Sequence, residues 1–581
     1  MSHFFLLILY QILSAEPKSY VEHYRENYLV RNDSLFYNVE KSVFVGSESA
    51  RESYGTIVIP FDDSRQRVRV VYARTISPKG DTIYVTPNAI NIVASELVNS
   101  YPFLSNRKEL HISFISIQPG SKLEYLVEIE ESPFTFLDGL CYFQEELEVK
   151  SREINFTLPK GLIFNFKLYE RGNLSIREEI CDSSNYVIYK FYSSEIPALP
   201  EVVTWRNHVP LYLASSVLVF STFPSWDSLM NHLKHFYLGR SDIKKQEQDL
   251  RRIVKLADLI DSPEYEPFTI QGYVPLNFDR ALNSTKMTFP EEVYRIISSN
   301  SGLSPAFVLR YGFSIAEAPP SLALIQTVIL FDGKKFINPF RGNKKPLVTD
   351  YSGYNALVLY DTSGYEERTI EVAHKNVCKI TLDVKGRKAF LQVEKGKFSY
   401  DYDSEEDENN RVEEKFLETY NRILNIFGNV KKTNIKVKGE NDPVSPVQIS
   451  GKVCYSDLGY KLSNYLIIEL PPFNLPNLSQ QQRGFFISRD EDVKNIVSLI
   501  ISMPKGYKVS LLPESFEIKT EDFELVFDAI QKENDIFVTY SLFFKKRYYT
   551  RDEVTKMNKA FADKGLLGRK WALIFEHVVE N

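Results

Sequence analysis

Apolar and polar residues alternate along much of the first two hundred positions, and this period of two predicts β-strands. In residues 66–85 alternate positions are apolar, and a Pro-Lys-Gly turn divides the segment into two halves. Residues 109–130 repeat this arrangement with a Pro-Gly turn, so we expect a hairpin in both segments. Residues 147–170 add two more strands around Pro159 and Gly161. Short strands separated by turns at regular intervals predict a β-sandwich.

The pattern changes to a helical spacing near residue 225. Residues 225–239 and 241–261 each place apolar side chains on one side of a helix. A third helix is expected from Thr288, because Glu291 follows it at capping-box spacing. The Asp-Gly pair at 332–333 then predicts a two-residue hairpin turn.

Beyond residue 342 the chain returns to strand patterns. Residues 379–403 predict a meander that turns at Lys385 and Gly386, and an amphipathic helix is expected near 411–427. A final helix near 550–563 should begin at Thr550, which again has a glutamate three residues later.

Composition supports a multidomain, β-rich chain. Because 581 residues exceed what one hydrophobic core organises, several domains are expected. The chain has 40 Phe and 35 Tyr but only 5 Met, a bias that suits half-buried strands. A net charge of -6 gives no basic footprint for nucleic acid, so we expect no nucleic-acid partner.

The N-terminus carries an apolar run from Phe4 to Leu13, followed by the small residues Ser14 and Ala15. A run of this length is too short to span a bilayer but suits a secretory signal peptide over residues 1–15. We therefore expect export to the periplasm or the extracellular space, with no transmembrane span after removal of the signal. The segment lacks Lys and Arg, so a buried first strand is the alternative.

The four cysteines, Cys141, Cys181, Cys378 and Cys454, are widely spaced and form no CxxC pair. This spacing argues against a zinc ribbon and against a dense disulfide framework. A disulfide bond between Cys141 and Cys181 could form after export, an alternative that the sequence does not decide. We expect no cofactor and no metal.

Four segments together carry a family resemblance: "RVRVVYARTISPKGD", "ISIQPGSKLEYLVEIE", "VKSREINFTLPKGLIFNFKL" and "ALPEVVTWRNHVPLYLASSVLVFSTFPSWDSLMNHL". They resemble bacterial exported proteins in which a β-domain of unknown function precedes a transglutaminase-like domain. The resemblance implies a multidomain, β-rich α+β chain. Its expected parts are an N-terminal β-sandwich over 16–205, a papain-related transglutaminase-like α+β domain over 206–342, and a C-terminal β-rich domain over 343–581.

A transglutaminase-like site needs a thiolate nucleophile, a histidine base and an aspartate that orients the histidine. The family pattern places the cysteine at a helix N-terminus, where the helix dipole lowers its pKa. Carried onto this chain, the resemblance puts Met287 at the cysteine position, Gln326 near the histidine position and Asn338 at the aspartate position. An alternative alignment at Ser301 and Gly302 supplies neither a cysteine nor a histidine.

No histidine occurs between His235 and His374, so a shift of alignment cannot supply a base. Ser284 and Thr285 lie near the nucleophile position, but a hydroxyl would also require a base. None of the three catalytic positions therefore carries its catalytic residue. This predicts a pseudoenzyme, a domain that keeps the fold and has lost acyl-transfer activity.

Three other groups invite chemistry, and each has a plainer interpretation. His374 and Cys378 could pair in catalysis, yet Cys378 alternates with apolar residues as a core thiol would. His232 and His235 could share a metal but lack further ligands. Residues 401–410 are acidic but lack the glycine and spacing of a calcium loop, so a solvated linker is favoured.

The sequence thus predicts an exported, non-catalytic binding or scaffolding protein on a degenerate transglutaminase-like fold. Its partner would be a polypeptide or a cell-envelope component, bound in the old cleft or along a sheet edge. The alternative is an active cysteine-dependent transglutaminase or protease with a displaced nucleophile. A purely architectural envelope protein is a third hypothesis.

Overall fold

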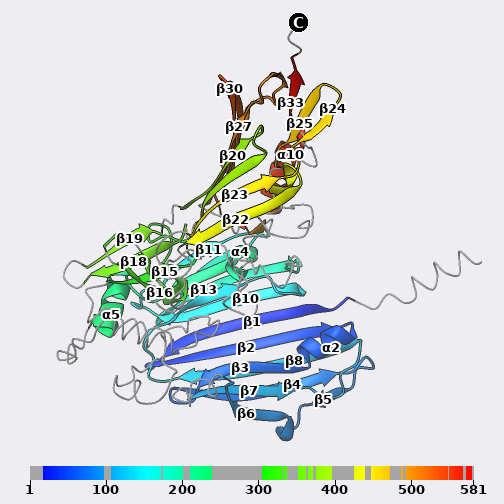
Figure 1. Ribbon diagram of the computed structural model, residues 1–581. Helices are drawn as coiled ribbons and strands as arrows, with labels where there is room; N and C mark the ends of the chain where they lie inside the picture. The colour runs from blue at the N-terminus through cyan, green and yellow to red at the C-terminus, as the bar shows by residue number, and fades with distance from the viewer. Residues whose placement is uncertain are drawn as a thin grey trace, which may run out of the picture.

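The computed structural model shows a β-rich chain built from several separate sheets, which confirms the predicted multidomain, β-rich fold class (Figure 1). It describes residues 18–96, 106–171, 174–199, 210–238, 304–331, 333–334, 336–337, 351, 353–360, 364–370, 374–395, 424–438, 447–471, 486–487, 493–546, 548–564, 566 and 571–578. The N-terminal residues 1–17, including the expected signal peptide, lie outside these ranges.

The N-terminal region contains one eight-stranded sheet and two three-stranded sheets. The large sheet has the order β12 (Arg177–Asp182), β13 (Tyr186–Ile196), β10 (Glu148–Pro159), β1 (Tyr20–Arg31), β2 (Ser34–Val45), β8 (Ser121–Glu131), β4 (Gln66–Ile76) and β5 (Thr82–Tyr84). The small sheets are β11 (Asn165–Tyr169), β14 (Val217–Ser221) and β9 (Asp138–Tyr142), and β3 (Thr56–Asp62), β7 (Arg107–Ser113) and β6 (Ile90–Ala94).

Each small sheet covers half of one face of the large sheet. Side chains of β1, β10 and β13, such as Phe156 and Phe191, share one core with Phe220 on β14. Side chains of β2, β8 and β4 share a second core with Leu110 on β7 and with the helix α2 (Glu48–Tyr54). The layers form a β-sandwich, and the opposite face of the large sheet carries polar residues.

The expected hairpin in residues 66–85 is confirmed, because β4 pairs antiparallel with β5. The hairpin expected in residues 109–130 is wrong, because β7 and β8 belong to different sheets. The chain crosses from the small sheet to the large one between these strands, with positive φ angles at Ser116 and Gly120. The two strands expected in 147–170 are present as β10 and β11, again in different sheets.

The middle of the chain forms a five-stranded sheet. Its order is β17 (Phe336–Ile337), β16 (Ile325–Phe331), β15 (Ser304–Leu309), β18 (Asn355–Tyr360) and β19 (Gly364–Thr369). One face packs against α5 (Trp226–Leu238), the short helix α4 (Leu211–Ala214) and the outer side of β14. The predicted hairpin near residue 333 is confirmed by the pairing of β16 with β17, but Phe331 pairs with Phe336, so the predicted two-residue turn is wrong and the connection is four residues long. The helices expected at 241–261 and from Thr288 lie outside the described residues.

The C-terminal region is a second sandwich. Its larger sheet has the order β22 (Val430–Lys438), β23 (Val447–Tyr455), β21 (Lys388–Lys395), β20 (His374–Asp383), β27 (Val493–Ser502), β31 (Asp535–Phe544), β30 (Phe523–Lys532) and β29 (Phe516–Lys519). The smaller sheet has the order β24 (Tyr460–Leu462), β25 (Tyr465–Glu469), β33 (Ala572–His577) and β28 (Tyr507–Leu511). Their facing side chains form one core.

The turn expected at Lys385 and Gly386 is confirmed, because β20 and β21 pair antiparallel around it. The last helix, α10 (Arg551–Asp563), begins at Thr550 with the predicted capping box to Glu553. Of the helix expected at 411–427, only residues 424–427 are described, and 424–426 are helical. In the described residues, no helix is long and apolar enough to cross a membrane.

Candidate functional site

Gln326 occupies an irregular position in the middle sheet. On β15, Val308 pairs with Thr327 of β16 and Leu309 pairs with Ile325, so Gln326 is left between two registers. Such bulges aim a side chain away from the regular ladder and occur often beside active sites. The Oε1 atom of Gln326 is buried and has no hydrogen-bond partner among the described residues. The position that the family resemblance gives to the histidine thus carries an unsatisfied amide.

The segment that leads into β16 is held by a buried carboxylate from the N-terminal sandwich. Asp138, on β9, accepts hydrogen bonds from the backbone N–H groups of Leu322 at 3.2 Å and Ala323 at 2.9 Å. These residues form η3 (Leu322–Leu324), whose N-cap is Ser321. Burial raises the pKa of Asp138 to about 6, although the hydrogen bonds from Ser321 and the backbone oppose the rise.

Two further contacts fix the loop between β15 and β16. The indole Nε1 of Trp226 on α5 donates to the carbonyl oxygen of Ala318 at 3.0 Å. The side chain of Arg310 donates to the carbonyl of Ala323 at 2.8 Å. The loop that precedes Gln326 is therefore tied to β9 and α5 and is closed within itself by Arg310, which gives this amide a defined place.

Met287 and Asn338, which the resemblance assigns to the cysteine and aspartate positions, lie outside the described residues, so their convergence with Gln326 stays a prediction. Ser284, Thr285, Ser301 and Gly302 lie outside them as well.

The rival pair His374 and Cys378 shares one strand, β20. Four residues along a strand span about 13 Å, which is too far for direct proton transfer within one strand. The Cys378 thiol is 6% exposed in the C-terminal core, and burial raises its pKa to about 12. These features fit a core thiol, since a nucleophile needs a lowered pKa and access.

The remaining sequence candidates gain no support for chemistry. His232 on α5 is exposed and contacts the rings of Phe136 and Phe223. In the described part of the chain, no three His, Cys, Asp or Glu residues are placed to hold a metal ion. The acidic residues 401–410 lie outside that part. All four cysteines are free, with Cys141 buried and Cys181 exposed, so the structure does not contain the bond left open between them.

Sequence reasoning missed a buried ionic cluster in the N-terminal sandwich. Arg152 on β10 is 1% exposed and pairs with Glu26 on β1 at 3.1 Å. The guanidinium also lies 3.6 Å from the ring centroid of Tyr24. Tyr24 donates to Glu26 at 2.7 Å, and the thiol of Cys141 donates to it at 3.2 Å. Burial opposes ionisation of Glu26, but Arg152 and these donors hold its pKa below the usual range.

This cluster lies where the two small sheets meet over the large one, because its neighbours belong to both cores. Beside it, Lys41 pairs with Glu145 at 2.6 Å, and its ammonium lies 4.6 Å from the ring centroid of Tyr24. A pairing between residues 126 positions apart leaves no local signal in the sequence. Among the described residues, the ionic cluster around Arg152 and Glu26 is fully packed, so we expect it to stabilise the sandwich.

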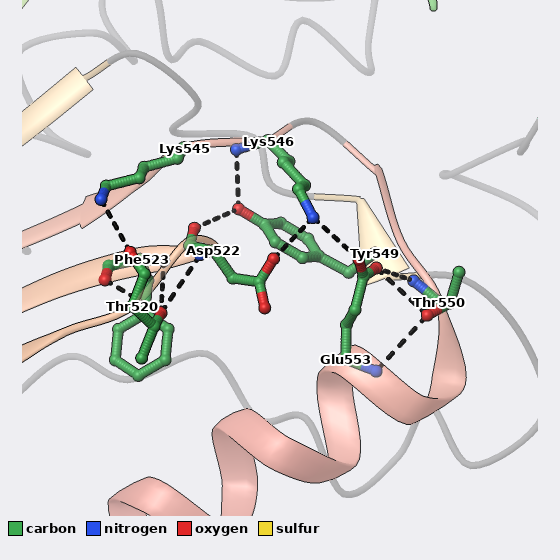
Figure 2. A network of polar contacts seen from close by, with 8 residues as sticks. All are labelled: Thr520, Asp522, Phe523, Lys545, Lys546, Tyr549, Thr550 and Glu553. Carbon is green, nitrogen blue, oxygen red and sulfur yellow. Dashed lines mark hydrogen bonds and ion pairs between the residues drawn. The ribbon is translucent and has the colours of Figure 1, made fainter.

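A second polar cluster attaches α10 to the C-terminal sandwich (Figure 2). Lys546 pairs with Asp522 at 2.6 Å and with Glu553 at 2.8 Å. Tyr549 donates to the backbone carbonyl of Asp522 at 3.0 Å, and Glu553 also accepts from the backbone of Thr550. Burial opposes protonation of Lys546, yet the two carboxylates raise its pKa above the usual range. All these groups are mutually satisfied, which is typical of a structural joint.

Comparison with known proteins identifies two regions. The model of DUF3857, a domain of unknown function with a solved structure, matches residues 32–200. The model of DUF3858, another such domain, matches residues 465–563. No curated protein matches the sequence.

One solved structure is similar over nearly the whole chain. It is a crystal structure from Parabacteroides distasonis described as a "putative protease", with 15% identity and a TM-score of 0.59, covering 97% of this chain and 100% of that chain. At this identity the likeness shows the fold alone. A family 3a carbohydrate-binding module from a Clostridium thermocellum scaffolding protein matches at 14% identity over 20% of this chain and 76% of its own. Its TM-score of 0.13 carries no argument.

The fold and the comparisons together identify the chain as a multidomain, β-rich protein. This particular chain has a DUF3857 match over its first sandwich and a DUF3858 match over its last.

Proposed function

We propose that this protein is an exported, non-catalytic binding or scaffolding protein whose middle region is a degenerate transglutaminase-like domain. The observation that carries the proposal is Gln326. An amide stands in a strand bulge at the position that the resemblance assigns to the histidine, and its buried oxygen lacks a partner among the described residues. An amide can bind a polar group of a partner but cannot accept a proton at neutral pH.

The distribution of thiols supports the same proposal. None of the four cysteines lies within residues 206–342, the expected extent of this domain. Cys141 and Cys378 are buried, and burial raises the pKa of both thiols, whereas acyl transfer needs a thiolate. The partner would be a polypeptide or a cell-envelope component that contacts the surface near Gln326.

The fold similarity to a structure described as a protease keeps an enzyme as the competing function. Incorporation of a labelled amine into dimethylcasein, and cleavage of labelled casein, should both stay at background with the full chain. Either activity, if abolished by iodoacetamide and by substitution of one cysteine, would show a displaced nucleophile and overturn the proposal.

Restoring the vacated groups tests the placement itself. The triple variant Met287→Cys, Gln326→His and Asn338→Asp should release nitrophenol from p-nitrophenyl acetate in a burst, because a thiol, a base and its orienting carboxylate would again be together. The matched control is Met287→Cys alone, which has the thiol without its base. A general base contributes at least about a hundredfold, so the triple variant should acylate faster by that factor. Equal rates for the two folded variants would mean that the three positions do not form a site.

A further inference from the structure

The larger sheet of the C-terminal sandwich has an outer face with an unusual charge distribution. On β20, Cys378, Ile380 and Leu382 enter the core, so residues 379, 381 and 383 point outward. The same alternation and the strand registers identify the outward residues of β21, β22 and β23. Six of them are lysines, which together define the lysine face: Lys379, Lys388, Lys432, Lys436, Lys438 and Lys452.

Two carboxylates, Asp383 and Glu394, point to the same side of these four strands. The Oδ1 atom of Asp383 accepts the N–H of Gly386 at 2.7 Å within the β20–β21 turn. Among the described residues, none of the six lysines forms an ion pair. The face is therefore strongly positive on a chain whose net charge is -6.

The outer face of the N-terminal sheet shows what a charge-balanced sheet looks like in the same protein. There Arg25 pairs with Glu153 at 3.0 Å and with Glu40 at 3.1 Å, and Arg74 pairs with Glu124 at 2.6 Å. Each cation faces a carboxylate on the neighbouring strand, which is the favourable cross-strand arrangement. On the lysine face only Lys388 has a carboxylate, Asp383, at the paired position of a neighbouring strand, whereas the other five lysines are paired with uncharged residues. An external anion would relieve the mutual repulsion of these lysines.

Neutral groups between the lysines point to the chemistry of that anion. From β22 to β20, one row across the sheet reads Lys436, Ser450, Gln392 and Lys379, all exposed. The neighbouring row contains Phe390, which is 44% exposed. A hydroxyl, an amide and an open aromatic ring thus lie among the cations.

The face has the size of an extended ligand. Lys432 and Lys438 are six residues apart along β22, which corresponds to about 20 Å. The row from Lys436 to Lys379 crosses three interstrand spacings, or about 14 Å. The ammonium of Lys452 lies 5.7 Å from the ring centroid of Phe390, so cation and ring are presented together.

We propose that the lysine face binds an acidic polysaccharide. Its carboxylate or sulfate groups would contact the lysines, a sugar ring would stack on Phe390, and sugar hydroxyls would bond to Gln392 and Ser450. A lipid bilayer is a poorer fit, because it offers no defined partners for the row of amide and hydroxyl groups. Membrane binding also needs apolar anchors, and these described residues present one exposed aromatic ring. This surface belongs to the C-terminal sandwich, whereas Gln326 belongs to the middle sheet, so the proposal does not rest on the function proposed for the middle domain.

The test measures binding of the full chain to polygalacturonate by titration calorimetry, with neutral dextran as the uncharged comparison. The variant Lys379→Gln, Lys436→Gln, Lys452→Gln should bind about tenfold to a hundredfold more weakly, because each exposed ion contact contributes a modest amount. The matched control is Lys505→Gln, Lys556→Gln, Lys559→Gln, which removes the same charge from exposed lysines elsewhere in the C-terminal region. It should keep the affinity of the unmodified chain.

Phe390→Ala separates stacking from charge. It should weaken binding while leaving the dependence of affinity on NaCl unchanged, whereas the triple lysine variant should flatten that dependence. Equal loss in the control variant, unchanged affinity in the triple variant, or equal binding of dextran would each overturn the proposal. Tighter binding to phosphatidylglycerol vesicles or to oligothymidylate than to polygalacturonate would also overturn it. Because all substituted side chains are exposed, melting temperatures should not change, and this measurement accompanies every titration.

Discussion

Removing the buried cation in the N-terminal sandwich should give a destabilisation with a distinctive pH dependence. In Arg152→Met, the carboxylate of Glu26 would stay in a core where it is 6% exposed, without its partner at 3.1 Å. Loss of one member of a buried ion pair typically costs about 3–5 kcal/mol.

The carboxylate can limit this loss by taking up a proton. From the ordinary glutamate pKa of 4.5, protonation at pH 7 costs about 3.4 kcal/mol, and at pH 5.5 only about 1.4 kcal/mol. In the variant the folded state would bind a proton that the unfolded state does not, so its stability falls as pH rises. The unmodified protein has the opposite sign, because Arg152 holds the pKa of Glu26 low. The destabilisation should therefore be about 2 kcal/mol larger at pH 7 than at pH 5.5.

Hydrogen exchange followed by mass spectrometry is the suitable assay, because a multidomain chain does not unfold in one step. Peptides that cover β1 and β10 report the opening free energy of the sandwich at each pH. The double variant Glu26→Gln, Arg152→Met should recover much of the stability and lose the pH dependence, because no charge remains buried.

The matched control is Arg25→Met, on the opposite face of β1, where the side chain is 46% exposed. It should cost less than about 1 kcal/mol, since exposed ion pairs contribute little. The reasoning would be refuted if Arg152→Met lost the same stability at both pH values, or if the double variant were as unstable as Arg152→Met.

Three further outcomes follow from the described residues. Because the pKa of Asp138 is raised to about 6, ionisation of this group lowers the stability of the folded state as pH rises from about 4 to 6. Relative to Asp138→Asn, the unmodified protein should lose about 3 kcal/mol of hydrogen-exchange protection in η3 and β16 peptides across that range. Parallel pH profiles of the two proteins would contradict this. Thr550→Ala removes the N-cap of α10 and should reduce protection of that helix by about 1 kcal/mol, with Thr550→Ser as the control that retains it. Iodoacetamide should label the exposed Cys181 of the native chain well before the buried Cys141 and Cys378, and peptide mapping that finds Cys378 labelled first would argue for a reactive thiol there.

The candidate site was only partly readable from the sequence. The family resemblance led to Gln326, but the bulge that isolates this residue depends on how β15 registers against β16. The sequence did not indicate a role for Asp138, because the residue lies 184 positions before Leu322, whose backbone N–H donates a hydrogen bond to it. A carboxylate in a strand pattern has many possible partners, and only the packing of β9 against η3 selects one.

The sequence by itself determined the local elements. Alternation gave the strands, and the Thr550 to Glu553 spacing gave the start of α10, because both depend on interactions between residues a few positions apart. The same reasoning wrongly joined β7 and β8 as a hairpin, since alternation does not say which sheet a strand enters.

Only the tertiary structure decided which distant side chains meet. Burial of apolar faces sends β7 and β8 to different layers, and the parallel pairing of β1 with β10 places Arg152 beside Glu26 in the interior. Likewise, lysines spread from residue 379 to residue 452 become one face only when four strands align in register. Charge along a chain is local, whereas a surface is made by strands that pair because their other faces share a core.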